Sequence, residues 1–184
     1  MLDFSLIDKN WTLFIDRDGV FNPEKINGYI LSVTEFTFYP EVLDVVKRLR
    51  ENFGLIIMVT NQKGIGKKMM SEADFHEISR YMLTEIKLHG GGIDRIYFAA
   101  DLEDTALNRK PNPGMALQAK KDFPQIDFSR SLMVGNKLSD MQFGRNAGMY
   151  TVFVATTNPE TPDPHPLIDA RFTDLKAFVE MLPD

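Results

Sequence analysis

The sequence predicts a doubly wound α/β fold with a mostly parallel sheet, and three observations carry that prediction. Short apolar runs without charged residues recur at 13–15, 55–59, 132–134 and 151–154, as expected of strands that are buried on both faces. Amphipathic helical patterns alternate with these runs along the chain. Polar loops follow the strands, so they should meet at one edge of the sheet. We therefore expect a Rossmann-like sandwich of three layers.

The composition favours a single domain that acts on a small molecule. A chain of 184 residues can bury one sizeable core, and its apolar residues are spread evenly, so residues 1–184 should form one domain. No apolar run is long enough for a membrane span and no secretory signal is evident, so we expect a cytoplasmic protein, with a monomer favoured. The net charge of −5 argues against a nucleic-acid partner. The absence of cysteine excludes thiolate metal sites, and three scattered histidines do not suggest a zinc cluster.

The first predicted strand, 13–15, ends in Asp16-Arg17-Asp18-Gly19. Two carboxylates at the end of a buried strand repel each other unless a cation offsets them, so this pair suggests a divalent metal with oxygen ligands. The alternative is an acidic turn that simply ends the strand.

Residues 19–40 carry turn signals around an apolar-rich patch at 29–38, which predicts a small hairpin or flap. A helix should follow Pro40, and Gly54 should close it. Its apolar stripe consists of Val42, Val45, Val46 and Leu49.

The second loop, Thr60-Asn61-Gln62-Lys63-Gly64-Ile65-Gly66, follows the strand at 55–59. A hydroxyl, successive backbone N–H groups and flexible glycines can together cradle a phosphate, although an exposed turn would have a similar composition. Ser71 and Asp74 predict the capped start of the next helix. The buried stripe of that helix should be Phe75, Ile78, Met82 and Ile86, and the helix should end at 89–92.

The third loop follows a strand at 93–100 and a polar segment at 101–108, and it contains Arg109 and Lys110. Asn112 can cap the next helix, with Pro113 in its first turn. The two cations would then lie near a helix N-terminus, where they could hold an anion. The alternative is an ordinary basic pair on the surface.

The fourth loop is Gly135-Asn136-Lys137-Leu138-Ser139-Asp140, after the strand at 132–134. Ser139 is a candidate helix cap, and Asp140 in the first turn could serve only to compensate the helix dipole. A strand at 151–154, a proline-rich loop and a last helix from Asp174 complete the chain.

Taken in order, Asp16-Arg17-Asp18-Gly19-Val20, Thr60-Asn61-Gln62, Arg109-Lys110-Pro111 and the 135–140 loop resemble the four motifs of the haloacid dehalogenase (HAD) superfamily. Within that superfamily the chain resembles the branch of D,D-heptose 1,7-bisphosphate phosphatases and histidinol-phosphate phosphatases, which have a small cap or none. The resemblance covers nearly the whole chain. It implies a HAD-like fold that is capless or has a minimal flap at 19–40.

The resemblance also implies two-step hydrolysis of a small phosphate ester through an aspartyl-phosphate. Asp16 would be the nucleophile, Asp18 the acid and base, and Lys110 the cation that offsets the charge of the phosphoryl group. Thr60, Asn61 and Gln62 would bind the transferred phosphate, and Arg109 the other groups of the substrate. The residues implied to hold Mg²⁺ are Asp16, Asp18 (also through its backbone carbonyl), Asn136 and Asp140.

Two departures from the branch stand out. The branch usually has an aspartate ligand where this chain has Asn136, so weaker metal binding or greater reliance on Asp140 is expected. Many relatives carry a zinc loop of cysteines and a histidine before the third motif, and residues 99–108 contain neither residue type.

Several functions are therefore open at the level of sequence. The leading hypothesis is a Mg²⁺-dependent phosphatase of heptose 1,7-bisphosphate, because Lys63, Lys67, Lys68 and Arg109 could bind a second phosphate, although Lys67 and Lys68 equally suit a solvated surface. Histidinol-phosphate phosphatase is the rival, with Glu103 and Asp104 as partners for an ammonium group. A phosphoacceptor signalling domain or a catalytically weakened HAD protein would also be compatible with these motifs.

Overall fold

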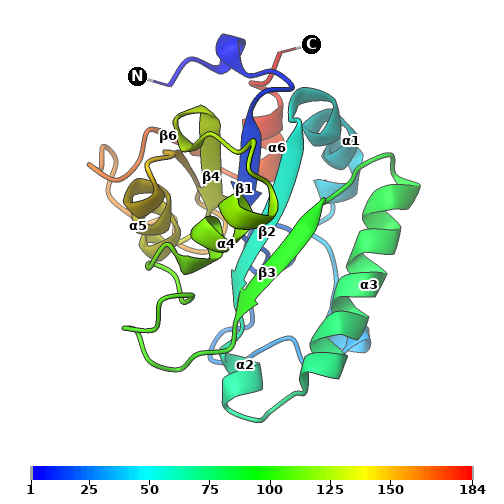
Figure 1. The fold of residues 1–184 in the computed structure, drawn as a ribbon. Helices are drawn as coiled ribbons and strands as arrows, with labels where there is room; N and C mark the ends of the chain where they lie inside the picture. The colour runs from blue at the N-terminus through cyan, green and yellow to red at the C-terminus, as the bar shows by residue number, and fades with distance from the viewer. Residues whose placement is uncertain (1, 184) are drawn as a thin grey trace.

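Six parallel strands form the central sheet of the computed structural model, which describes residues 2–183 (Figure 1). Their spatial order is β3-β2-β1-β4-β5-β6, and every neighbouring pair is parallel. The strands are β1 (Thr12–Ile15), β2 (Leu55–Asn61), β3 (Arg95–Ala99), β4 (Ser131–Gly135), β5 (Tyr150–Val154) and β6 (Ala170–Phe172). β1 lies in the middle of the sheet, between β2 and β4, so the first predicted loop opens at the centre of the sheet edge.

Helices cover both faces of the sheet and make the predicted three-layer sandwich (Figure 1). One face packs against α1 (Val42–Asn52), α3 (Glu72–Leu88) and α6 (Leu175–Val179), and the other against α4 (Gly114–Asp122) and α5 (Leu138–Ala147). The alternation within β1 sets this division: Leu13 and Ile15 belong to the first core, and Phe14 to the second. The α/β fold class is therefore confirmed. Shorter elements are α2 (Lys63–Gly66) and the 3₁₀ turns η1 (Phe4–Leu6), η2 (Val33–Glu35) and η3 (Phe128–Arg130).

The two helices with the strongest sequence signals form as predicted. All four apolar residues of the predicted α1 stripe are buried, as are the four of α3. α3 begins with a capping box, in which the Ser71 hydroxyl accepts from the Asp74 N–H at 3.1 Å and the Asp74 carboxylate accepts from the Ser71 N–H at 2.8 Å. Local patterning alone determines these elements.

The small hairpin predicted within residues 19–40 is not present, because no residue of this segment belongs to a named strand. The segment instead runs through short turns, such as the bond from the Phe36 N–H to the Val33 carbonyl at 3.1 Å, and includes η2. Its apolar residues enter the core separately: Ile30 and Phe36 are buried in the first core. Phe36 packs against Tyr81 of α3, with the ring centres 6.1 Å apart, and not against a partner across a hairpin.

Three details of the element ends also differ from prediction. Pro113 is the N-cap of α4, and the Asn112 side chain instead donates to the Asp104 and Ala106 carbonyls at 2.9 and 3.0 Å. Lys137, not Ser139, is the N-cap of α5, because the helix begins earlier than expected. The sixth strand, β6, was not predicted, since it is only three half-buried residues long and follows a proline-rich loop. Within residues 2–183, no helix combines the length and apolarity that crossing a bilayer requires.

Candidate active site

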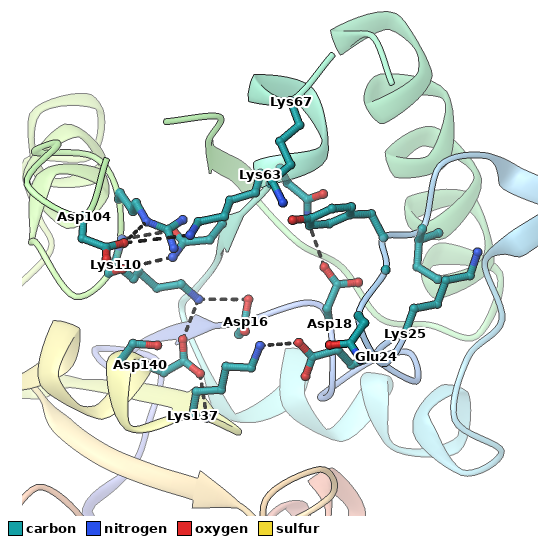
Figure 2. A pocket seen from close by; sticks show the side chains of 18 of the residues that line it. Asp16, Asp18, Glu24, Lys25, Lys63, Lys67, Asp104, Lys110, Lys137 and Asp140 are labelled. Atoms are coloured by element: carbon teal, nitrogen blue, oxygen red, sulfur yellow. Dashed lines mark hydrogen bonds and ion pairs between the residues drawn. The ribbon is translucent and has the colours of Figure 1, made fainter. Parts of the chain in front are cut away.

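The four polar loops meet at a pocket of about 1030 Å³ at the carboxyl edge of the sheet (Figure 2). Seven of the nine residues proposed from the sequence line this pocket: Asp16, Asp18, Asn61, Gln62, Arg109, Lys110 and Asp140. The other two, Thr60 and Asn136, are fully buried next to lining residues. Convergence of segments so far apart in the sequence follows from the parallel sheet, since every strand ends at the same edge.

Asp16 and Lys110 form the centre of the pocket. Asp16 directly follows β1, where its N–H donates to the Val134 carbonyl at 3.0 Å, and only 7% of the residue is exposed. The Lys110 ammonium lies 2.9 Å from the Asp16 carboxylate and 2.7 Å from that of Asp140 (Figure 2). Burial raises the pKa of Asp16 to about 7, although Lys110 opposes the rise. Burial works to lower the pKa of Lys110, but the negative charges of Asp140 and Asp16 outweigh the effect of burial, so the pKa is raised overall.

Asp140 caps α5, as one of the two sequence interpretations predicts, and it also pairs with Lys110. Its Oδ2 atom accepts from the backbone N–H groups of Asn136 at 3.1 Å and Lys137 at 3.0 Å, so it caps the start of α5. Its Oδ1 atom pairs with Lys110. A residue that caps a helix is held rigidly, and Asp140 therefore fixes the position of the lysine as well.

Asp18 is held by a network of donors that sequence reasoning missed. Arg17 Nη2 donates to both of its oxygens at 2.9 and 3.0 Å, and the side-chain amides of Asn22 and Gln62 donate at 2.9 and 3.0 Å. Burial works to raise the pKa of Asp18, but the Arg17 charge and these hydrogen bonds lower it overall. The two aspartates thus have pKa values displaced in opposite directions, which is a pattern found where two carboxyl groups have different chemical tasks.

Arg17 itself is almost fully buried, with 1% of the residue exposed, and its guanidinium lies 5.7 Å from the centre of the Phe75 ring. A buried arginine beside an acid and an aromatic ring is difficult to anticipate from sequence, because an arginine between two aspartates suggests a solvated turn. No pattern in the sequence distinguishes this arginine from one in a solvated turn.

The side chains of the second motif, residues 60–62, form hydrogen bonds within the motif and to the backbone of the third motif. Asn61 both donates to the Lys110 carbonyl and accepts from the Lys110 N–H, each at 3.0 Å, so this side chain fixes the backbone of the third motif. Thr60 Oγ1 accepts from Gln62 Nε2 at 2.8 Å.

The predicted glycine loop is instead α2, where Gly64 packs against Tyr29 and Gly66 against the Ala100 carbonyl. These glycines permit close packing and do not line the pocket.

Further cations line the pocket. Lys63, Lys67 and Arg109 line it, whereas Lys68 does not. Asp104 accepts from Arg109 Nε at 2.9 Å and lies 4.0 Å from Lys63, so one carboxylate holds both cations in place (Figure 2). The 101–108 loop that contains Asp104 is held by hydrogen bonds from Asn112, without any cysteine.

The residues around Asn136 fit a hard cation. Asn136 is fully buried, and within residues 2–183 its Oδ1 atom has no hydrogen-bond partner. No group of three or more Asp, Glu, His or Cys side chains in this part of the chain is placed to hold a metal, so a cation here would need the Asn136 amide oxygen in addition to carboxylates. The available donors are all oxygens, which suit Mg²⁺ and not a thiolate-binding metal. Gly19, with φ +83°, leaves the space that the Asn136 side chain occupies.

The sequence and the fold of this chain are similar to those of known phosphatases. A family model described as HAD-hydrolase-like matches residues 107–173. D-glycero-alpha-D-manno-heptose-1,7-bisphosphate 7-phosphatase of Burkholderia mallei is 38% identical over 154 residues, covering 79% of this chain and 80% of that protein. D-glycero-beta-D-manno-heptose-1,7-bisphosphate 7-phosphatase of Helicobacter pylori strain J99 is 32% identical over 179 residues, covering 96% and 99%.

Among solved structures, D,D-heptose 1,7-bisphosphate phosphatase from B. bronchiseptica, complexed with magnesium and phosphate, superposes with a TM-score of 0.83. It is 26% identical and covers 92% of this chain and 96% of its own. A parallel sheet with an Asp-x-Asp pair and a lysine at its carboxyl edge thus defines a phosphoryl-transfer hydrolase. The chain belongs to the haloacid dehalogenase (HAD) superfamily, and it is a phosphatase that hydrolyses phosphate monoesters.

Proposed function

We propose that this phosphatase removes the 7-phosphate of D-glycero-D-manno-heptose 1,7-bisphosphate and uses Mg²⁺. The observation that carries the proposal is that three cations, Lys63, Lys67 and Arg109, line the pocket in addition to the lysine beside Asp16. A bisphosphate brings a second dianion that needs such partners. The names of the relatives support the same substrate.

In the proposed mechanism, Asp16 attacks the phosphorus atom and the ester oxygen leaves, which produces an aspartyl-phosphate. Asp18 gives its proton to the leaving oxygen and then takes one from the water that hydrolyses the intermediate. The lowered pKa of Asp18 belongs to the pocket without substrate, and an arriving phosphate dianion adds negative charge that raises this pKa toward the protonated form. Lys110 keeps Asp16 oriented and offsets charge on the phosphoryl group.

Thr60, Asn61 and Gln62 are proposed to bind the transferred phosphate, with Asn61 acting mainly by fixing the Lys110 backbone. Asp16, Asn136, Asp140 and the backbone carbonyl of Asp18 would hold Mg²⁺, which would neutralise charge on the phosphoryl oxygens. Residues 24, 25 and 27–30 line the pocket, which supports a single domain over 1–184 in which the 19–40 segment forms one wall.

Histidinol phosphate is the second candidate, and the pocket gives it less support. Its ammonium group would need a free acid, but Asp104 already holds Arg109 and Lys63, and Glu103 does not line the pocket. A phosphoacceptor domain would also need its phosphoaspartate to persist, whereas Asp18, two residues from Asp16, is placed to promote its hydrolysis.

The test is phosphate release from both anomers of heptose 1,7-bisphosphate and from histidinol phosphate, with Mg²⁺ present. We expect higher kcat/KM on a bisphosphate, with the 1-phosphate retained in the product by ³¹P NMR. Arg109→Ala should raise KM for the bisphosphate selectively, while Lys68→Ala, a nearby cation outside the pocket, should leave it unchanged. A preference for histidinol phosphate, or an equal loss on both substrates in Arg109→Ala, would contradict the assignment.

A further inference from the structure

Asn136 creates a problem of orientation that an aspartate at the same position would not have. A carboxylate offers an oxygen on either side, whereas an amide offers oxygen on one side and an N–H₂ group on the other. Only the oxygen can bind a cation, and the N–H₂ group would repel it. Because Asn136 is fully buried, something in its surroundings must select one of the two orientations.

Glu24 makes that selection. Asn136 Nδ2 donates to Glu24 Oε2 at 3.5 Å and also to the Thr157 hydroxyl. A hydroxyl can donate or accept, so Thr157 fits either orientation of the amide, but an ionised carboxylate only accepts. The nitrogen must therefore face Glu24. This leaves Oδ1 as the atom without a partner in residues 2–183.

Glu24 also contributes negative charge near the aspartates. Its carboxylate lines the same pocket as Asp16, Asp18 and Asp140 and pairs with Lys137. A carboxylate near a cation site favours the bound cation electrostatically.

We propose that Glu24 compensates for the missing carboxylate at position 136, as a positioning residue that holds the Asn136 amide oxygen toward the cation and supplies negative charge. Glu24 lines the same pocket (Figure 2) and is carried by the 19–40 segment, while Asn136 follows β4, so the two are brought together only by the fold. The inference rests on the proposed function, because it concerns the Mg²⁺ of that reaction.

The experiment is calorimetric titration of each metal-free variant with Mg²⁺ in the absence of any substrate. Glu24→Ala should weaken Mg²⁺ binding about tenfold, and Glu24→Gln should give a comparable loss, because an uncharged amide can donate or accept and no longer selects one orientation. Glu35→Ala is the matched control, since Glu35 lies in the same segment and pairs with Lys25 at 2.8 Å but does not line the pocket. It should leave Mg²⁺ affinity unchanged.

The Asn136→Asp background tests the coupling directly. An aspartate has no amide to orient, so Glu24→Ala there should weaken Mg²⁺ binding clearly less than in the wild-type background, because only the charge of Glu24 is lost. The same tenfold weakening in both backgrounds would overturn the inference, because the two residues would then act independently.

A second variant distinguishes two roles of Glu24. One is to orient the Asn136 amide, and the other is only to hold the 19–40 segment in place through the ion pair with Lys137. Lys137→Met removes a cation, so the inference expects Mg²⁺ affinity to stay the same or increase. If closure were the whole role of Glu24, Lys137→Met would weaken Mg²⁺ as much as Glu24→Ala does, and that result refutes the inference. A wild-type protein that binds no Mg²⁺ and hydrolyses its substrate without it would instead refute the metal in the proposed function.

Discussion

Replacing Asp16 by asparagine should stop catalysis and, at neutral to alkaline pH, stabilise the metal-free protein. The pKa of Asp16 is raised from an ordinary 3.8 to about 7. At 1.36 kcal/mol for each pKa unit, ionising this buried group above pH 7 costs the folded state about 4 kcal/mol. Asparagine avoids that cost but weakens a hydrogen bond to the charged Lys110, which is worth about 1.5–3 kcal/mol. The variant should therefore be more stable by roughly 1–3 kcal/mol at pH 8.

The pH dependence of the stability difference between Asp16→Asn and the wild type gives a sharper test. Between pH 3.8 and 7 the folded wild type retains a proton that the unfolded chain has released, so wild-type stability falls as pH rises through this window. The asparagine of the variant does not titrate, so the advantage of the variant should be smaller at pH 5 than at pH 8 by about 3 kcal/mol. Urea unfolding of both proteins in EDTA at pH 5 and pH 8 measures this change in the stability difference. Titrating groups that are shared by the two proteins contribute equally to both and drop out of the comparison. An advantage that does not change with pH would refute the reasoning about Asp16.

Catalysis by the same variant tests the nucleophile separately. Removing a nucleophile typically costs a hydrolase on the order of 10³-fold or more in turnover. Folded Asp16→Asn protein with turnover comparable to wild type would show that Asp16 does not attack phosphorus.

Three further predictions concern the acid and base and the metal. Asp18→Asn should be severely slow and accumulate an acid-stable phosphoprotein, detected after quenching with labelled substrate; full activity would contradict its role. Asn136→Asp should lower the Mg²⁺ concentration for half-maximal activity about tenfold, or about 1.4 kcal/mol, and no change would place residue 136 outside the coordination sphere. EDTA should abolish turnover but lower Tm only by the small amount that loss of a bound ligand causes, whereas melting that collapses on chelation would indicate a structural metal.

Much of the fold could be predicted because its signals are local. The α1 stripe and the α3 capping box depend on residues within a few positions of one another, and both are present as expected. The edge at which the loops converge could also be predicted, since parallel strands all end on the same side. β6 could not, because three half-buried residues carry no periodic signal and join the sheet only through β5.

The contacts that complete the site were harder to predict, because they join distant parts of the chain. The motifs named Asp18 and Asn136, but no pattern indicated that Asn22 would hold the first or that Glu24 would reach the second. The apolar patch at 29–38 gave a misleading signal, since it looks like a strand but forms no strand, and its Phe36 is buried against α3. Such pairings are set by packing of the whole molecule.

The central position of β1 has a consequence for the chain during its synthesis. β1 is complete at Ile15, but one of its two neighbours, β4, begins only at Ser131. At translation rates of about 5–20 residues per second, the apolar edge of β1 waits roughly 6–23 seconds for that partner. During this interval the nascent chain presents an unpaired, hydrophobic strand edge, which is the surface that promotes aggregation. The growing polypeptide should therefore depend most on ribosome-associated chaperones before residue 135 emerges, and much less after its release.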